Sequence, residues 1–255
     1  MKIVVLVKQV LDTWGERRLD LSTGLLDRSS SDLIIDEVGE RALEAALAYK
    51  DANDADVIVM TMGPREATDV LRKGLAMGAD TAVHVLDDEL AGSDMVRTAT
   101  VLAAALRRTG FDLVITGNES TDGRGGAIAP MLSEILGVPQ VTYLNSLAIA
   151  ADGISGERGT EAGTQDVHAS LPAVASVTER SPEPRFPGFK GSMRAKKKPL
   201  DTWALSDLGE SGSPAARSVV LSTAERPART AGRKVVDDGS AAHELAAFLS
   251  DEHLI

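Results

Sequence analysis

The 255-residue chain contains no cysteine, and this absence excludes several kinds of chemistry. Disulfides, thiolate nucleophiles, cysteine-held iron–sulfur clusters and cysteine-ligated zinc all need that residue. The four histidines, at positions 84, 168, 243 and 253, do not stand at metal-ligand spacing from one another. We therefore expect no metal site, and we expect histidines that lie at the surface or at strand ends.

Aromatic residues, long apolar runs and an excess of basic residues are also scarce or missing. Aromatics make up 3% of the chain, so the core must be built from Val, Leu, Ile and Ala. No apolar run approaches the roughly 20 residues that span a bilayer, and the start of the chain lacks a signal-peptide pattern. The formal net charge of -11 argues against nucleic acid as the main partner, because a phosphate backbone selects for basic surface. We expect a cytoplasmic protein.

Short apolar runs alternate with helical patterns along the first two-thirds of the chain. This alternation predicts a doubly wound α/β fold with a mostly parallel sheet. A first helix is expected at 36–50, with Val38, Ala42, Ala45 and Tyr49 on one stripe. Three more are expected, from Pro64 at a first helical position to Met77, from a Ser93 cap to Arg108, and from the end of the 117–126 glycine cluster to Gly137. Strands buried on both faces are expected at Ile3–Val7, Val57–Thr61, Ala82–Val85 and Leu113–Thr116.

The pattern changes after Pro139. Strand-like segments around Val141–Ile149, Asp166–Ser170 and Ala173–Val177, joined by Gly/Asp turns, predict an antiparallel addition to the sheet. The stretch 207–239 is polar and has little capacity to form a core, and a short helix is expected at 241–249. We therefore predict an α/β domain at 1–206 and an extended C-terminal arm at 207–255 that needs a partner to order it.

The stretch that follows the strand at 113–116 is the most informative local feature. It reads Gly117-Asn118-Glu119-Ser120-Thr121-Asp122-Gly123-Arg124-Gly125-Gly126-Ala127 and leads into a helix. Small residues allow close backbone approach to an anion, and the helix start presents free N–H groups and the positive end of its dipole. The stretch lacks a Walker A or G-x-G-x-x-G fingerprint. The residues alone therefore leave two interpretations open, a phosphate cradle and a flexible loop.

A second stretch, residues 183–198, combines aromatic, proline, glycine and basic residues. Phe189 and Met193 stand beside a basic run, which is typical of an exposed protein-docking element. The alternative is a solvated basic loop whose aromatic side chains fold inward. Catalytic patterns are missing, because there is no Gly-x-Ser-x-Gly elbow and the acidic residues near 36–40 are explained by a helix dipole.

Several short motifs, in order along almost the whole chain, resemble the β subunit of electron-transfer flavoproteins. The first, Val7-Lys8-x-Val10-x-Asp12, is typical of that family's start. Each motif is weak alone, but the ordered set is specific, and the Gly-Asn-Glu-Ser-Thr-Asp-Gly form is closest to the actinobacterial branch. The remaining motifs are Met77-Gly78-Ala79-Asp80, the 117–126 loop, Leu171-Pro172-Ala173-Val174, Glu183-Pro184-Arg185, Met193-Arg194-Ala195-Lys196-Lys197-Lys198 and Arg229-x-x-Gly232.

The resemblance implies an electron carrier rather than an enzyme with its own substrate. The partner would be an α subunit that holds most of the FAD, and this chain would help enclose the flavin and bind one structural AMP in an adenine-nucleotide-binding fold. Electrons would arrive from flavin dehydrogenases, such as the acyl-CoA dehydrogenases of fatty acid oxidation. They would leave towards a membrane quinone oxidoreductase and the respiratory chain.

The resemblance also assigns roles to residues by position. Thr13 and Trp14 would lie near the flavin, Phe189 and Met193 would dock dehydrogenases, and Arg229 would lie where the arm crosses the α subunit. The AMP contacts would be Leu6, Asp36, Glu37, Val38, Gly39, Met62, Gly117, Asn118, Glu119, Ser120, Thr121, Asp122, Gly123, Arg124, Gly125, Gly126, Ala127 and Ile128.

The chain departs from the family pattern at three places. Residues 123–126 replace an acidic run, Phe189 replaces an aliphatic anchor, and Gly159 follows Arg158 where many relatives carry Glu. Two other functions stay open. One is the β subunit of an electron-bifurcating flavoprotein with a second FAD in place of AMP. The other is a nucleotide-binding protein that acts alone on ATP.

Overall fold

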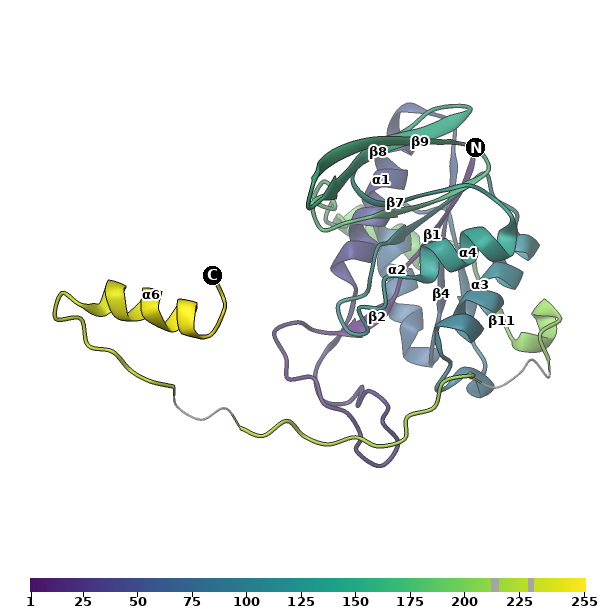
Figure 1. Ribbon diagram of the computed structural model, residues 1–255. Coiled ribbons are helices and arrows are strands. Elements are labelled where there is room, and N and C mark those ends of the chain that lie inside the picture. The colour runs from purple at the N-terminus through teal and green to yellow at the C-terminus, as the bar shows by residue number, and fades with distance from the viewer. Residues whose placement is uncertain (212–215, 229–231) are drawn as a thin grey trace. The chain divides into compact units, whose positions relative to one another are not determined.

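The computed structural model describes residues 1–211, 216–228 and 232–255, which divide into two compact units, 1–221 and 222–255 (Figure 1). The first unit is built on a nine-stranded sheet in the order β11-β5-β4-β1-β6-β10-β7-β8-β9. Its strands are β1 (Lys2–Leu6), β4 (Asp56–Met62), β5 (Thr81–Val85), β6 (Leu113–Gly117), β7 (Gln140–Ile149), β8 (Gly153–Thr160), β9 (Gly163–Ser170), β10 (Ala173–Val177) and β11 (Leu200–Trp203). A separate antiparallel pair joins β2 (Gln9–Leu11) to β3 (Leu33–Ile35).

The strand pairing confirms the predicted doubly wound, mostly parallel sheet. All pairs from β11 to β7 are parallel, and β7, β8 and β9 form an antiparallel extension. One detail of the expectation was wrong, because β10 does not belong to the antiparallel addition. It lies between β6 and β7 and pairs parallel with both, so the chain crosses back into the sheet after the β8–β9 hairpin.

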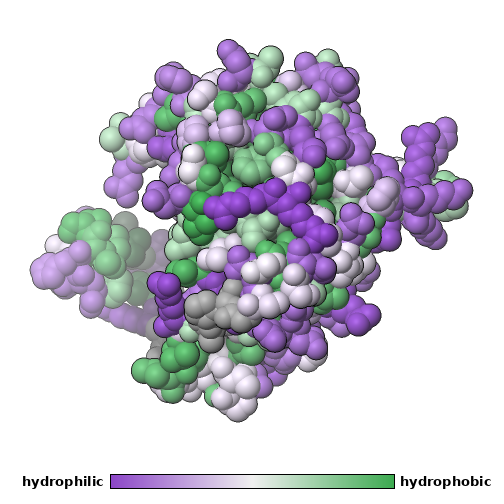
Figure 2. Space-filling view, turned by 90° about the vertical axis from the view of Figure 1, so that its right-hand side faces the viewer, coloured by the Kyte–Doolittle hydropathy of each residue, from purple (hydrophilic) through white to green (hydrophobic). Residues whose placement is uncertain are grey.

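Helices cover both faces of the sheet, and the alternation of side chains along β1 builds two cores. Ile3 and Val5 point into the core beneath α1 (Glu37–Ala52) and α2 (Thr68–Met77), and Val4 points into the core beneath α3 (Met95–Thr109) and α4 (Ile128–Leu136). Each core consists mainly of Val, Leu, Ile and Ala, as the low aromatic content predicts. On the side of the molecule around α3 and the short helix η3 (Leu205–Leu208), hydrophilic residues surround smaller hydrophobic areas (Figure 2).

The helix starts differ from the sequence expectation at two places. Asp94 rather than Ser93 caps α3, since its Oδ1 accepts a hydrogen bond from Arg97 N at 2.8 Å. Pro64 precedes a short helix η1 (Arg65–Ala67), and α2 begins only at Thr68. A third short helix, η2 (Asp88–Leu90), precedes α3.

Of two further helices, one was not predicted from the sequence and the other was. Helix α5 (Phe189–Ala195) forms inside the basic 183–198 stretch, for which we predicted only a loop. The second unit contains the predicted final helix as α6 (Ala241–Asp251), with Leu245 and Phe248 exposed. No helix among the described residues is both long and apolar enough to cross a membrane.

Candidate nucleotide and docking sites

The predicted nucleotide residues meet at the carboxyl ends of the central strands. Leu6 ends β1 and pairs in register with Thr116 of β6, directly before the 117–128 loop. Met62 ends β4, two residues beyond Met60, the partner of Leu6 on the other side. This edge of a parallel sheet is where doubly wound folds bind ligands.

Asp36 joins helix α1 to the 117–128 loop. The carboxylate is buried, and its Oδ1 caps α1 by accepting from Val38 N at 3.1 Å. Its Oδ2 accepts from both the backbone N and the Oγ1 of Thr121, at 2.7 and 2.9 Å. The acidic residue at the helix start therefore has a second task beyond the helix dipole, which is to hold the loop against α1.

The first half of the loop packs against the same helix. A side chain at Gly117 would come within 3.1 Å of Val38, and Gly39 lies beside Val7. Glu37 is exposed, so it faces away from this contact. The structure thus brings the loop together with Asp36, Val38 and Gly39, while Glu37 stands at the surface.

Lys8 holds the middle of the loop from the end of β1. Its Nζ donates to Ser120 Oγ at 3.1 Å and to Asp122 Oδ1 at 2.7 Å, and the Asp122 side chain is almost fully buried. Burial alone would raise the pKa of the Asp122 carboxyl. The hydrogen bond and charge of Lys8, with donors from Ser120 and Gly123, outweigh burial and hold that pKa below its ordinary value of 3.8.

The two glycines that end the loop are required by their neighbours. Gly126 has a φ of +63°, and a side chain there would overlap the Tyr143 hydroxyl, which donates to Gly126 O at 3.2 Å. A side chain at Gly125 would overlap Sδ of Met95. Close approach of these two protein side chains therefore explains the glycines.

Unpaired polar groups of the loop fit a bound nucleotide. Oδ1 of Asn118 is buried and accepts no hydrogen bond within residues 1–211, 216–228 and 232–255. Ala127 provides no side-chain cap for α4, so the first backbone N–H groups of this helix receive no acceptor from the side chain of the N-cap residue. An adenine amino group or a ribose hydroxyl could donate to Asn118, and phosphate oxygens could accept at the helix start. Arg124, which lies 3.4 Å from Glu119 and is largely exposed, adds a cation at the rim.

His84 lies near this edge of the sheet, in β5. We expected a surface or strand-end histidine, but His84 is fully buried in β5. Its Nε2 lies 3.0 Å from Gly63 O and its Nδ1 lies 3.2 Å from Thr68 Oγ1. Burial lowers the pKa of this imidazole and favours the neutral form, in which Nε2 donates to the carbonyl and Nδ1 accepts from the hydroxyl. His84 thus fixes the turn that follows Met62.

Thr13 and Trp14 lie on an excursion at residues 12–32, between β2 and β3. Trp14 is 97% exposed, but its backbone is held, because Asp12 Oδ1 accepts from Trp14 N at 2.9 Å. Gly15 closes the turn with a hydrogen bond from its N to Asp12 O at 3.1 Å and packs against Ser31, where a side chain would not fit. The structure therefore presents an exposed indole on a well-defined turn.

The 183–198 stretch is fastened to two helices and presents its apolar side chains outward. Phe189 is 83% exposed and Phe186 and Met193 are also exposed, so the alternative of aromatic side chains folded inward does not apply. On the inner side, Gly191 approaches Ala76 O of α2 so closely that no side chain would fit. Arg72 donates to Ala195 O at 2.9 Å, which fixes the end of α5.

The last lysine of the basic run is not a surface charge. Nζ of Lys198 donates to the carbonyls that end α2, those of Leu75 at 3.2 Å, Gly78 at 3.4 Å and Ala79. Burial lowers the pKa of this ammonium group. A cation at a helix carboxyl end is stabilised by the dipole, so Lys198 anchors the stretch while Lys196 and Lys197 extend from it.

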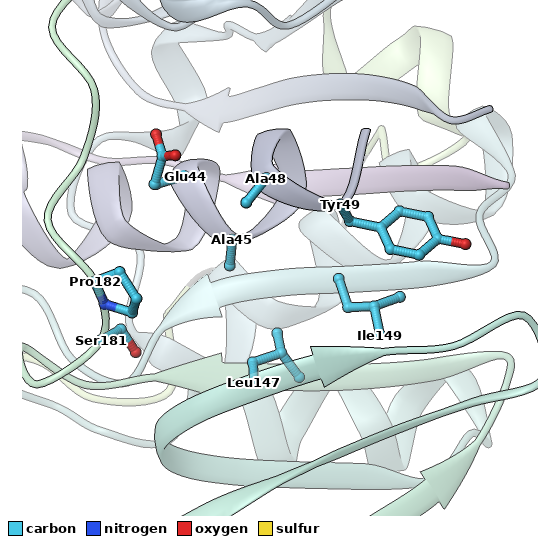
Figure 3. A pocket seen from close by; sticks show the side chains of 8 residues that line it. All are labelled: Glu44, Ala45, Ala48, Tyr49, Leu147, Ile149, Ser181 and Pro182. Carbon is cyan, nitrogen blue, oxygen red and sulfur yellow. The ribbon is translucent and has the colours of Figure 1, made fainter. Parts of the chain in front are cut away.

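A hollow with a volume of about 210 Å³ lies beside this anchored stretch, between α1 and β7 (Figure 3). This hollow explains why two residues of the stripe predicted for α1 do not belong to the buried stripe of that helix. Ala45 and Tyr49 line the hollow, whereas the buried stripe of α1 runs through Ala42, Leu43, Ala46 and Leu47. The hollow is apart from the 117–128 loop, and Arg229, the predicted contact in the arm, lies outside the described residues.

Comparison with known proteins places this doubly wound α/β protein in a family. The electron transfer flavoprotein domain matches residues 23–208. The electron transfer flavoprotein subunit beta of Mycobacterium tuberculosis (strain ATCC 25618 / H37Rv) is 46% identical over 263 residues, covering 99% of each chain. The subunits of the same name from Mycobacterium leprae and Bacillus subtilis are 45% and 33% identical and cover 99% of this chain and 99% and 98% of their own.

The chain therefore belongs to the electron transfer flavoprotein family, as the ordered motifs predicted. Its relatives are beta subunits, and the similarity extends over nearly the whole length of both chains. The higher identity to the mycobacterial subunits than to that of Bacillus subtilis agrees with the predicted actinobacterial form.

Proposed function

We propose that this chain is the β subunit of a heterodimeric electron-transfer flavoprotein and that it carries electrons without turning over a substrate of its own. The observation that carries the proposal is similarity to beta subunits over 99% of the chain, combined with a loop at the strand ends that holds a buried, unpaired acceptor, Asn118 Oδ1. The bound flavin would supply the redox chemistry, and the residues of this chain would enclose it and bind partners.

The 117–128 loop is the proposed site of one AMP. Backbone N–H groups at the start of α4 would hold the phosphate, supported by Lys8 and Arg124. Asn118 Oδ1 would accept from the adenine or the ribose, which would satisfy a buried acceptor. Leu6, Val38 and Met62 would supply the apolar walls.

The remaining exposed segments have proposed partners. Trp14 would lie against the flavin of an α subunit that holds most of the FAD, and the arm, including Arg229, would wrap that subunit. Phe189 and Met193 would dock flavin dehydrogenases, such as acyl-CoA dehydrogenases, because they are exposed apolar groups on a helix that is anchored to α2. We propose a cytoplasmic carrier that passes electrons to a membrane quinone oxidoreductase.

Co-expression with the α subunit tests the proposal. The purified complex should be yellow and should release one FAD and one AMP per heterodimer on denaturation. The full-length chain expressed alone should be colourless, because most FAD contacts belong to the partner. Two FAD per heterodimer would instead indicate the electron-bifurcating alternative. A chain that purifies alone with stoichiometric FAD, or that hydrolyses ATP alone, would overturn the proposal.

A further inference from the structure

Arg17 bridges the Trp14 excursion and the 117–128 loop. Its guanidinium donates to the carbonyl of Thr121, to Thr121 Oγ1 at 3.1 Å and to Leu11 O at 2.9 Å. It is half-buried in an excursion whose neighbouring side chains are mostly exposed. Arg17 therefore donates two hydrogen bonds to Thr121 of the loop. It also donates one to Leu11, directly before the 12–32 excursion.

Further hydrogen bonds connect Thr121 to the start of helix α1. Thr121 Oγ1 accepts from Arg17 and donates to Asp36 Oδ2, and Asp36 caps helix α1. On the other side, Trp14 stands three residues before Arg17 on the turn that Asp12 and Gly15 close. An unbroken series of hydrogen bonds and short backbone segments thus leads from the exposed indole to the centre of the loop.

One donor of Arg17 is left over. Its Nε is buried and has no hydrogen-bond partner among the described residues. Buried donors are normally satisfied, and an oxygen of a nucleotide bound at the loop would offer the missing acceptor. Occupancy of the loop would then act on Arg17 directly as well as through the position of Thr121.

We propose that Arg17 is a positioning residue that couples nucleotide occupancy of the 117–128 loop to the orientation of Trp14. The inference rests on the proposed function, because it takes the loop as the nucleotide site. Arginine suits this role because its planar fork makes two hydrogen bonds to one residue, which a lysine cannot reproduce. Nucleotide binding would therefore hold the Trp14 turn in one orientation.

Fluorescence of the isolated full-length chain tests the coupling. The chain has two tryptophans, so the substitution Trp203→Phe leaves Trp14 as the only indole. The ring that stacks under Arg108 is replaced by another aromatic ring. After removal of bound nucleotide, the anisotropy of Trp14 is followed during an AMP titration, and AMP binding is measured separately by equilibrium dialysis. We expect a saturable rise in anisotropy with the same midpoint as binding.

The variants Arg17→Lys and Arg17→Ala should lose this rise even at saturating AMP. By reciprocity, they should also bind AMP about five-fold or more weakly. Arg18→Lys is the matched control, since the guanidinium of Arg18 donates to the carboxylate of Glu16, and it should retain the full response.

The outcomes separate this inference from the proposed function. AMP binding by dialysis without a change in Trp14 anisotropy, or an unchanged rise in Arg17→Lys, would overturn the coupling and leave the nucleotide site intact. If Arg17 had only a structural role, its substitution would lower stability, but the protein that stays folded would still show the AMP-dependent rise in Trp14 anisotropy. Absence of AMP binding by the unsubstituted chain would overturn both the site and the coupling.

Discussion

Arg185 and Glu44 form a two-pronged ion pair that fastens the start of the docking stretch to helix α1. Nε and Nη2 of Arg185 each lie 2.8 Å from one carboxylate oxygen of Glu44, and Nη2 is also 2.8 Å from Asp51. The hydrogen bonds to Glu44 and Asp51 raise the pKa of Arg185, and those from Arg185 lower the pKa of Asp51. The pair sets where residues 186–195 leave the body of the protein.

Replacing Arg185 by Lys should loosen this attachment. Lysine keeps the charge but cannot bind both oxygens of Glu44, so we expect a loss of roughly 1 kcal/mol in the free energy of unfolding. Hydrogen exchange should increase in α5 and remain unchanged in α3. Equal exchange in α5 of both proteins would show that the α2 contacts alone fix the stretch.

Phe189→Ala should slow electron transfer from a partner dehydrogenase. Loss of a central aromatic anchor costs about 2 kcal/mol of binding, which corresponds to a roughly 30-fold weaker complex. FAD and AMP content should not change. Val96→Ala, which shortens an exposed apolar residue of α3, is the control. Normal transfer kinetics in Phe189→Ala would remove this residue from the docking surface.

Gly126→Ala should destabilise the loop for two separable reasons. A left-handed φ costs an alanine about 1 kcal/mol, and the new methyl group would overlap the Tyr143 hydroxyl. The double variant Gly126→Ala/Tyr143→Phe should recover the overlap cost but not the backbone cost. Urea denaturation of the four proteins of this cycle measures both parts, and AMP content should follow the stability of the loop.

His84 should make stability depend on pH. Its folded-state pKa is lowered below 6.5, so the unfolded chain binds the proton more readily. Stability is therefore full above pH 6.5 and falls as the pH drops from there to the folded-state pKa, by at most about 1.4 kcal/mol per pH unit. His84→Gln should flatten this part of the unfolding profile. A profile that keeps the same slope in His84→Gln would assign the effect to other groups.

Truncation should separate the body of the protein from its arm. Leu205 is buried, and Asp94 Oδ2 accepts from Arg217 N at 2.7 Å and Ser218 N at 3.0 Å, so Leu205, Arg217 and Ser218 contact the body of the first unit, which ends at Leu221. A chain ending at Leu221 should unfold at the same urea concentration as the full chain but fail to bind the α subunit. A chain ending at Trp203 should lose about 2 kcal/mol through Leu205. Tight α-subunit binding by the shorter chains would show that the arm is dispensable.

The sequence predicted those features that local patterns determine. The central strands follow from continuous apolar runs, and the helix that begins beside Asp36 and the loop after β6 follow from residue types at fixed positions. The place of β10 could not be predicted, because an apolar run does not reveal the direction or partner of its strand. The same limit applies to α5, whose position depends on α2 rather than on its own sequence.

The site was predicted as a set of residues but not as a network. The contact between Arg17 and Thr121 joins residues 104 positions apart, and nothing in the local sequence of either residue indicates the other. His84 was missed for a related reason, since a histidine in an apolar strand reveals its burial only through its neighbours, Gly63 and Thr68. The glycines at 125 and 126 were noticed, but Met95 and Tyr143 were not expected to require them.

The insertion of β10 between β6 and β7 has a consequence for synthesis on the ribosome. When β1, β4, β5 and β6 have emerged, the apolar edge of β6 still lacks its neighbour, and the edge of β5 waits for β11. Unpaired strand edges template wrong association, and long-range parallel pairing is slow. The nascent chain therefore exposes the edge of β6 until β10 has emerged and the edge of β5 until β11 has emerged, which makes chaperone protection most important during that interval.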